Sequence, residues 1–196
     1  MSGKNQSYTG FLSEFLRRPL TVGAVAPSSP YLAQEILQGI GLPEASVIVE
    51  YGPGMGVFTQ KILALKGAGA RVVAVEKNPK FAAHIRYRFP TVELLEGSVT
   101  DLPTALVNMG INHADCIVSG LPWASFSGSE QDRLLQATEA VLRPGGHFVT
   151  FAYIHGLVLP EARRFRERLR RQFRTVRTSH VVWRNLPPAF VYRCVR

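Results

Sequence analysis

Cysteine is scarce in this sequence, and no long apolar run occurs. The two cysteines, Cys116 and Cys194, each fall inside a short apolar segment, where a free thiol behaves as a small hydrophobic side chain. Two such residues make neither a disulfide framework nor a zinc site, so we expect no metal and a reducing cytoplasm. No stretch approaches the roughly 18 apolar residues of a spanning helix, and the N-terminus lacks the order of a signal peptide. If this protein meets a membrane, we expect it to do so from the surface.

Acidic side chains are also few. The sequence has 14 of them against 23 lysines and arginines, for a net charge of +9, which favours polyanions such as nucleic-acid phosphates or anionic lipid headgroups. Apolar residues at helical spacing between the C-terminal arginines allow a third interpretation, the solvated face of a helix. Charge alone does not choose among them. The arginines concerned are Arg163, Arg164, Arg166, Arg168, Arg170, Arg171, Arg174 and Arg177.

The length and the pattern of the chain predict one α/β domain. Its 196 residues, 46% of them apolar, suffice for one substantial core. From residue 46 onward, short β-branched runs alternate with helix-like segments, which is typical of a parallel sheet. The predicted strands are 46–51, 71–76, 92–96, 114–119, 147–153, 174–183 and 189–195. The predicted helices are 57–66, 79–88, 101–108, 130–142 and 160–171.

The end of the chain points to one kind of α/β fold. Only a short Pro-containing turn separates the last two predicted strands, so we expect them to be antiparallel neighbours. A mostly parallel seven-stranded sheet with a C-terminal antiparallel hairpin resembles the Rossmann-like class I methyltransferase fold. The segment 142–146, Leu-Arg-Pro-Gly-Gly, also resembles that class, in which a helix ends on glycine and re-enters the sheet.

The first 45 residues lie outside this pattern. We expect a helical N-terminal cover over residues 1–45 and a Rossmann-like domain over 46–196. A second helix in the cover begins after Ser28 or Ser29 as its cap, with Pro30 in its first turn. This helix should direct Leu32 and Ile36 inward.

A glycine-rich turn follows the first strand of the domain and opens a helix, the context in which such a motif binds a cofactor. Gly52 and Gly54 permit a tight turn, and Gly56 lets the helix pack closely on the strand. Glu76 ends the second strand about 20 residues later, where an acidic side chain accepts ribose hydroxyls. The alternative is an ordinary strand-to-helix turn.

Glu50, directly before these glycines, distinguishes two classes of cofactor. Pyrophosphate lies near this position in dinucleotide enzymes and would be repelled by a carboxylate. The sulfonium of S-adenosylmethionine would be attracted, so we expect this cofactor. After the third strand, Ser98 stands where many relatives carry an acidic adenine contact, so the hydroxyl or a backbone carbonyl must serve.

The fourth strand ends in Ser-Gly-Leu-Pro-Trp, residues 119–123, at the sheet edge where substrates bind. This resembles the Asn-Leu-Pro-Tyr motif of adenine dimethyltransferases, but Gly120 replaces the amide that selects a planar base amine. Trp123 keeps an aromatic face that can stack on a base or hold an ammonium group. Packing in the core is the alternative for Trp123.

Over nearly its whole length the chain resembles the bacterial phospholipid N-methyltransferases. The motifs are residues 15–29, the glycine loop, residues 119–123 and residues 185–192. The resemblance implies stepwise methylation of phosphatidylethanolamine toward phosphatidylcholine by a peripheral enzyme on the cytoplasmic face of the membrane. It also implies that an amphipathic N-terminal helix docks on anionic lipid, for which we expect Phe11, Phe15, Arg17 and Arg18. The same apolar face would equally suit a cover for the core.

Methyl transfer needs an uncharged amine in line with the methyl group. Tyr153 and His155, at the end of the fifth strand, are candidates for a base, although both also have ordinary structural interpretations. Aromatic residues around the amine, Trp123 among them, would suit cationic products. We expect neither nucleic acid nor a protein partner. The alternatives are an rRNA adenine N6-methyltransferase-like enzyme and a non-catalytic lipid-binding module.

Overall fold

The computed structural model describes residues 28–196 of the chain. These residues form a seven-stranded sheet in the order β3-β2-β1-β4-β5-β7-β6. Strands β1 to β5 are parallel, whereas β7 runs antiparallel to both β5 and β6. The Rossmann-like methyltransferase fold predicted from the sequence, with its C-terminal antiparallel hairpin, is therefore confirmed. The strands are β1 (Val47–Tyr51), β2 (Arg71–Glu76), β3 (Glu93–Glu96), β4 (Ala114–Ser119), β5 (Leu142–Tyr153), β6 (Thr175–Thr178) and β7 (Ala189–Val195).

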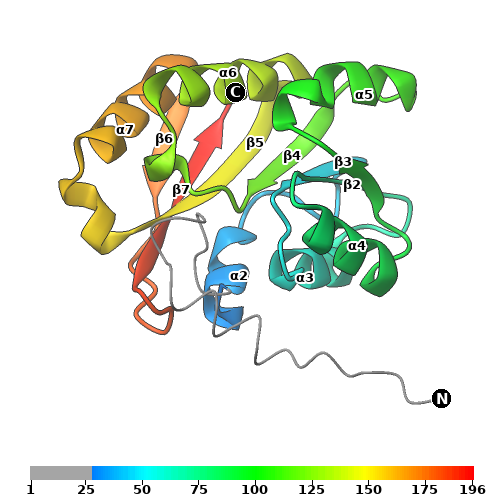
Figure 1. Ribbon diagram of the computed structural model, residues 1–196, viewed down its shortest axis with the longest axis horizontal. Helices are drawn as coiled ribbons and strands as arrows, with labels where there is room; N and C mark the ends of the chain where they lie inside the picture. The colour runs from blue at the N-terminus through cyan, green and yellow to red at the C-terminus, as the bar shows by residue number, and fades with distance from the viewer. Residues whose placement is uncertain (1–27) are drawn as a thin grey trace.

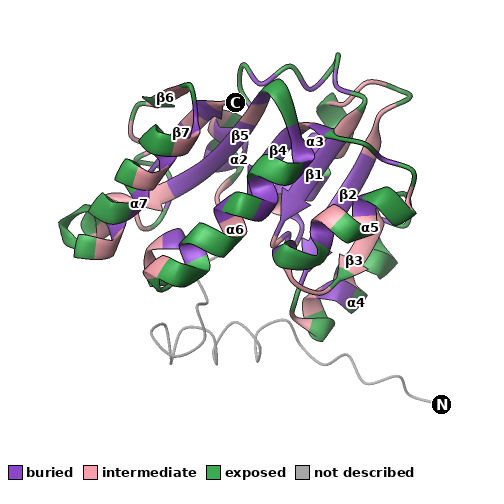
Figure 2. Cartoon of the chain, turned by 90° about the horizontal axis from the view of Figure 1, so that it is seen from above, coloured by how far each residue is buried: buried purple, intermediate pink, exposed green. Residues whose placement is uncertain are grey.

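Helices cover both faces of this sheet (Figure 1). Side chains of α2, α3 and α4 pack on one face, and those of α5, α6 and α7 on the other. Figure 2 shows the result, with buried residues along the strands and exposed residues on the outer sides of the helices. The helices are α2 (Pro30–Ile36), α3 (Val57–Leu65), α4 (Pro79–Arg88), α5 (Leu102–Asn108), α6 (Gly128–Val141) and α7 (Pro160–Gln172), with short 3₁₀ turns η1 (Val99–Asp101), η2 (Trp123–Ser125) and η3 (Ile154–Val158).

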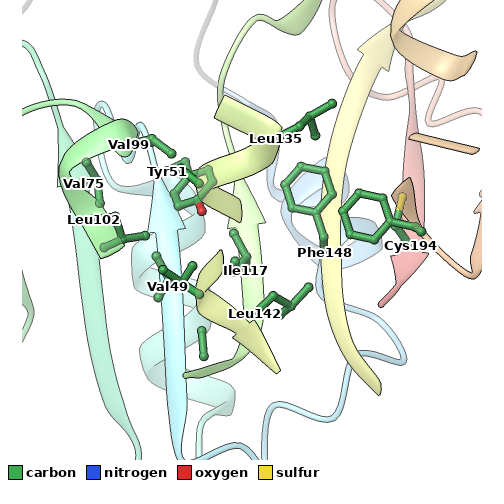
Figure 3. Close-up of a cluster of buried hydrophobic side chains, with 14 of the residues drawn as sticks. Val49, Tyr51, Val75, Val99, Leu102, Ile117, Leu135, Leu142, Phe148 and Cys194 are labelled. Atoms are coloured by element: carbon green, nitrogen blue, oxygen red, sulfur yellow. The ribbon is translucent and has the colours of Figure 1, made fainter. Parts of the chain in front are cut away.

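One half of the core lies between the sheet and α5, α6 and α7. Figure 3 shows Val49, Tyr51 and Ile117 from the central strands beside Leu102 of α5, Leu135 of α6 and Phe148 of β5. Such parallel strands are buried on both faces, which explains their continuous β-branched sequences. The second half holds Ile48, Phe58 and Ile62 together with α2. Both cysteines are buried and free, as predicted.

The helix α2 belongs to this core. Ser29 caps it, because its side chain accepts a hydrogen bond from the Leu32 amide at 3.2 Å, and Pro30 occupies the first turn. Leu32 and Ile36 are buried, as expected. In addition, Arg193 of β7 donates to the Glu35 carboxylate at 2.7 Å. Residues 28–45 of the expected N-terminal cover thus pack directly on the sheet.

The end of one predicted strand and the start of one predicted helix are wrong. The strand predicted over 174–183 ends at Thr178, and only an isolated bridge, Val182 with Ala189, continues it. The bridge is displaced by one residue from the register Thr178↔Tyr192, as at a β-bulge. The helix predicted from residue 130 begins at Gly128, because Ser127 and Glu130 form a capping box before it.

The glycines at 145 and 146 also lie elsewhere than predicted. Helix α6 ends at Val141 with an extended Leu142 as its cap, so it does not end on glycine. The strand β5 already begins at Leu142, and its pairing with β4 shifts between Leu142 and His147. Gly145, with φ of 74°, lies in this irregular start of β5.

Candidate active site

The parallel register brings the carboxyl ends of three central strands together. Tyr51 of β1 pairs with Ser119 of β4, and Ser119 pairs with Thr150 of β5. The loops after these strands therefore open at one edge of the sheet, which is where doubly wound folds bind their ligands. This edge is where the glycine loop leaves β1, where the segment 119–123 leaves β4, and where Tyr153 ends β5.

The glycine loop between β1 and α3 needs residues without a side chain. Gly52, Gly54 and Gly56 all have positive φ, of 63°, 54° and 80°, a region that other residues rarely adopt. A Cβ on Gly52 would lie 3.0 Å from Leu121, whereas a Cβ on Gly54 would meet nothing within 4 Å. The segment after β4 thus packs against the loop at Gly52, whereas the space beside Gly54 is free of protein atoms.

Gly56 has a different role from the one predicted. It caps the N-terminus of α3, and a Cβ there would lie 2.3 Å from the Phe89 ring and 3.2 Å from Ile85. The close approach is therefore to α4 and the residue after it, not between α3 and its strand.

Glu50 is fully buried beneath the loop. Its Oε2 accepts a hydrogen bond from the Thr59 hydroxyl at 2.7 Å, while Oε1 has no hydrogen-bond partner among the described residues. Burial raises the pKa of this carboxyl from 4.5 to about 8; the bonds from Thr59 oppose the shift, and the nearby charge of Glu76 adds to it. A buried carboxylate with a free oxygen is costly unless it meets a positive partner.

Glu76 ends β2 and contacts the same loop. Its Oε2 accepts from the Gly54 amide at 3.2 Å, and its Oε1 accepts from the Asn78 amide at 2.8 Å. These bonds hold the end of β2 against the tip of the loop, 22 residues earlier in the chain. A carboxylate has about four acceptor positions, so Glu76 keeps capacity for further donors such as ribose hydroxyls.

Ser98 is held in a local cap. Its hydroxyl accepts hydrogen bonds from the Thr100 amide at 3.2 Å and the Thr100 hydroxyl at 2.8 Å. Its own amide donates to Asp101 at 3.0 Å, which completes a capping box for η1. The adenine contact expected of Ser98 remains a prediction, and the structure shows its hydroxyl serving the cap.

The segment after β4 packs tightly against the glycine loop. The Gly120 amide donates to the Tyr51 carbonyl at 2.8 Å, and a Cβ on Gly120 would lie 2.7 Å from the Gly52 carbonyl oxygen. No real Cβ tolerates that distance to backbone, so an asparagine here would require the backbone to move. The packing of Gly120 against Gly52 therefore explains why this chain lacks the asparagine of the adenine dimethyltransferase motif.

Trp123 lies in the core. Its ring stacks on Phe165 of α7 with centroids 4.8 Å apart, and its Nε1 donates to the Ser119 hydroxyl at 2.9 Å. The residue is buried. Of the two interpretations of Trp123, the structure agrees with core packing. Cation–π contact with an acceptor amine has no structural support, because the ring is enclosed by protein.

Tyr153 ends β5, and His155 follows it in η3. Their rings stack with centroids 5.6 Å apart, and His155 is exposed. The Tyr153 hydroxyl is buried and has no hydrogen-bond partner within residues 28–196, and burial raises its pKa. The hydroxyl therefore stays protonated at physiological pH and can donate or accept a hydrogen bond.

Some expectations lie beyond the described residues, and some contacts were missed. Phe11, Phe15, Arg17 and Arg18 fall outside residues 28–196. Within that range no three His, Cys, Asp or Glu side chains form a metal-binding group, and no helix is both long and apolar enough to cross a membrane. Sequence reasoning missed Thr59, whose only signal is its place in the first turn of α3, where its hydroxyl reaches Glu50.

The residues fit S-adenosylmethionine. The buried Glu50 Oε1 lacks a partner, Glu76 keeps acceptor capacity, and the loop is open at Gly54. Fold and site together define a class I S-adenosylmethionine-dependent methyltransferase. The chain belongs to this family, since residues 48–146 match the family described as a methyltransferase domain.

Individual relatives differ in how much of the chain they match. The chain is 34% identical to an ornithine lipid N-methyltransferase from Singulisphaera acidiphila, over 94% of this chain and 93% of that protein. Ribosomal RNA small subunit methyltransferase A from Chlorobaculum parvum is 31% identical over only 37% of this chain and 25% of its own length. The fold is similar to an O-methyltransferase from Bacillus cereus in complex with SAH, with a TM-score of 0.65, 20% identity and coverage of 100% and 93%.

Proposed function

We propose that this chain is an N-methyltransferase acting on the amine headgroup of a membrane lipid. The observation that carries the proposal is the end-to-end similarity to an ornithine lipid N-methyltransferase, over 94% of this chain and 93% of the relative. Phosphatidylethanolamine is the acceptor that the sequence motifs imply, and an ornithine lipid is the acceptor named for the relative. Both lipids present a primary amine, so both belong in the test.

The acceptor edge supports an amine that is not part of a nucleobase. Adenine recognition by the related motif relies on an amide at the position of Gly120, and the 2.7 Å approach of a Cβ to Gly52 leaves no room for one. The rRNA methyltransferase relative from Chlorobaculum parvum matches only about a third of this chain. The similarity to this rRNA methyltransferase is therefore local, whereas the similarity to the lipid N-methyltransferase spans the chain.

We assign the cofactor to Glu50, Glu76 and the glycine loop. S-adenosylmethionine, when bound, supplies a methyl group on a positively charged sulfur. Glu50 offers a buried oxygen without a hydrogen-bond partner among the described residues for positive charge at the methionine end. Glu76 offers acceptors for the ribose hydroxyls, and we keep Ser98 as a residue at the adenine end.

We assign the acceptor amine to the neighbourhood of Tyr153 and His155. The amine must give up a proton before its nitrogen forms the new bond to carbon, and His155 is exposed where it can take that proton to solvent. The protonated Tyr153 hydroxyl, buried without a hydrogen-bond partner within residues 28–196, can accept from the amine and orient it. Trp123 acts as a positioning residue, since it holds the Ser119–Trp123 turn in place.

Labelled S-adenosylmethionine tests the acceptor class. The full chain is incubated with vesicles containing phosphatidylethanolamine, vesicles containing an ornithine lipid, and bulk RNA, and each fraction is counted. We expect label in one or both lipids and none in RNA. Label in RNA alone would contradict the proposal, and so would label in no fraction.

Two variants test the residues assigned to the amine. We expect Tyr153→Phe and His155→Gln to lower kcat about 10- to 100-fold with unchanged affinity for S-adenosylmethionine. His113→Gln is the matched control, because His113 is exposed before β4 at the opposite edge of the sheet. Full activity of both Tyr153→Phe and His155→Gln would show that neither residue serves the amine.

A further inference from the structure

Large apolar side chains are exposed beside the candidate active site. Trp183 and Leu186, in the loop between β6 and β7, are 74% and 83% exposed, and Val158 of η3 is 77% exposed. Tyr31, Leu157 and Leu159 are also exposed. Single exposed apolar residues need no explanation, but a group of them at one edge of a protein marks an interaction surface.

Backbone contacts join these residues into one surface. Tyr153, which precedes η3, pairs with Ala189, and the Ile154 amide donates to the Pro188 carbonyl at 3.0 Å. Ala189 in turn bridges to Val182, next to Trp183. Figure 1 shows η3, the loop between β6 and β7, and α2 on the same side of the molecule.

The start of α2 is fastened to the same loop. The Ser29 amide donates to Asn185 at 2.9 Å. The Arg184 guanidinium lies over the Tyr31 ring, 4.9 Å from its centroid, and donates to its hydroxyl at 3.1 Å. Tyr31 is therefore held against the loop that carries Trp183 and Leu186.

Positive charge borders this surface. Arg184 lies within it, and Arg163 and Arg164 follow in the first turns of α7. Glu161 lies 3.6 Å from Arg164, but α7 contains six arginines and only two glutamates, so positive charge is in excess. Exposed apolar side chains with arginines nearby match the interface of an anionic bilayer, where a tryptophan ring sits at the level of the headgroups.

We propose that Tyr31, Leu157, Val158, Leu159, Trp183 and Leu186 form a membrane-docking surface whose partner is an anionic lipid bilayer. The proposal deepens the proposed function and rests on it for the choice of partner. Because η3 begins directly after Tyr153, a bilayer on this surface would present headgroups at the carboxyl edge of the sheet. The acceptor would then reach the site without leaving the membrane.

Tryptophan fluorescence reports on this surface directly. The chain has two tryptophans, Trp183 in the docking surface and Trp123 in the core. We expect vesicles of phosphatidylglycerol and phosphatidylethanolamine to shift the emission of the full chain to shorter wavelength, and brominated lipids to quench it. Trp183→Phe should abolish both effects, since Trp123 is enclosed by protein.

Vesicle sedimentation measures the contribution of the surface. We expect the double variant Trp183→Ser, Leu186→Ser to bind these vesicles at least about tenfold more weakly, with unchanged affinity for S-adenosylmethionine. Val107→Ser is the matched control, because Val107 is 73% exposed near the end of α5, away from this edge. Equal vesicle binding by the double variant and the wild type would overturn the proposal.

The other possible occupants give different results. If residues 1–27 or a second copy of the chain cover the surface, acrylamide will fail to quench Trp183 in the absence of lipid, and the proposal fails. Failure of the proposed function looks different. In that case Trp183 enters the bilayer and the double variant loses binding, but no lipid gains label from S-adenosylmethionine.

Discussion

At the scale of single residues, Glu50 stands out because it is buried without full hydrogen bonding. Only Thr59 pairs with one of its oxygens, and the other has no hydrogen-bond partner among the described residues. Such a group is costly in the folded protein and useful only when a cationic partner arrives. Replacing the Glu50 carboxyl by a neutral group should therefore weaken cofactor binding and stabilise the cofactor-free protein.

We predict that Glu50→Gln weakens the binding of S-adenosylmethionine about tenfold or more, while the cofactor-free protein gains stability at alkaline pH. Burial raises the pKa of Glu50 from 4.5 to about 8. The stability linked to its bound proton is complete below pH 4.5 and is lost as the pH rises through about 8. The glutamine cannot lose a proton, so its advantage should reach a few kcal/mol at pH 8.

Calorimetric titration and urea unfolding at pH 5.5 and pH 8 measure the two effects. The difference in the free energy of unfolding between Glu50→Gln and the wild type should grow toward pH 8. A variant that loses stability at both pH values and still binds the cofactor normally would show that Glu50 is only structural.

Gly120 illustrates the limit of sequence reasoning at this scale. The glycine in place of an amide was visible in the motif, where it weighed against a nucleobase. Its reason was not visible, because the Gly52 carbonyl that excludes a side chain belongs to a loop 68 positions earlier. Trp123 shows the same limit, since its burial depends on Phe165 of a distant helix.

At the scale of elements, α2 shows how a short helix is held. It has seven residues, too few for stability on its own. The cap at Ser29, the burial of Leu32 and Ile36, and the ion pair of Glu35 with Arg193 attach it to the sheet. The sequence left Ser28 and Ser29 as equal candidates for the cap.

We predict that Ser29→Ala lowers the free energy of unfolding by about 1 kcal/mol. The substitution leaves the Leu32 amide without its capping acceptor. Ser28→Ala is the neighbouring control and should change stability by less than half as much. Urea unfolding of the full chain distinguishes them, and equal effects of the two substitutions would contradict the assignment of the cap.

The strands that were predicted correctly are those with continuous buried sequences, such as β2 and β4. β6 was predicted too long, because a register shift near Ser179 is decided by its pairing with β7 and not by local composition. The loop that results carries Trp183 and Leu186. A strand that continued to residue 183, as predicted, would have included Trp183 in the sheet.

At the scale of the whole molecule, the net charge of +9 complements an anionic membrane. The arginines of α7 belong to a helix whose Phe165 and Leu169 are buried, so the charges face outward. Long-range attraction of this kind is screened by salt, whereas apolar insertion is not.

We predict that binding to anionic vesicles weakens strongly but incompletely between about 0.1 M and about 1 M salt, over which the Debye length falls from about 10 Å to about 3 Å. The residual binding should disappear in the double variant Trp183→Ser, Leu186→Ser. Vesicles of purely zwitterionic lipid serve as the comparison and should show little dependence on salt. Binding that is unaffected by salt would exclude a role for the arginines.

The sequence by itself determined the fold class, most of the strands and the class of cofactor, because these depend on local patterns. Buried strands need β-branched runs, and a tight loop over Glu50 and Glu76 needs glycines. Only the tertiary structure decided which aromatic residues belong to the core and which are exposed at the sheet edge. That choice depends on contacts between segments far apart in the chain. They bury Trp123 in the core and leave Trp183 exposed.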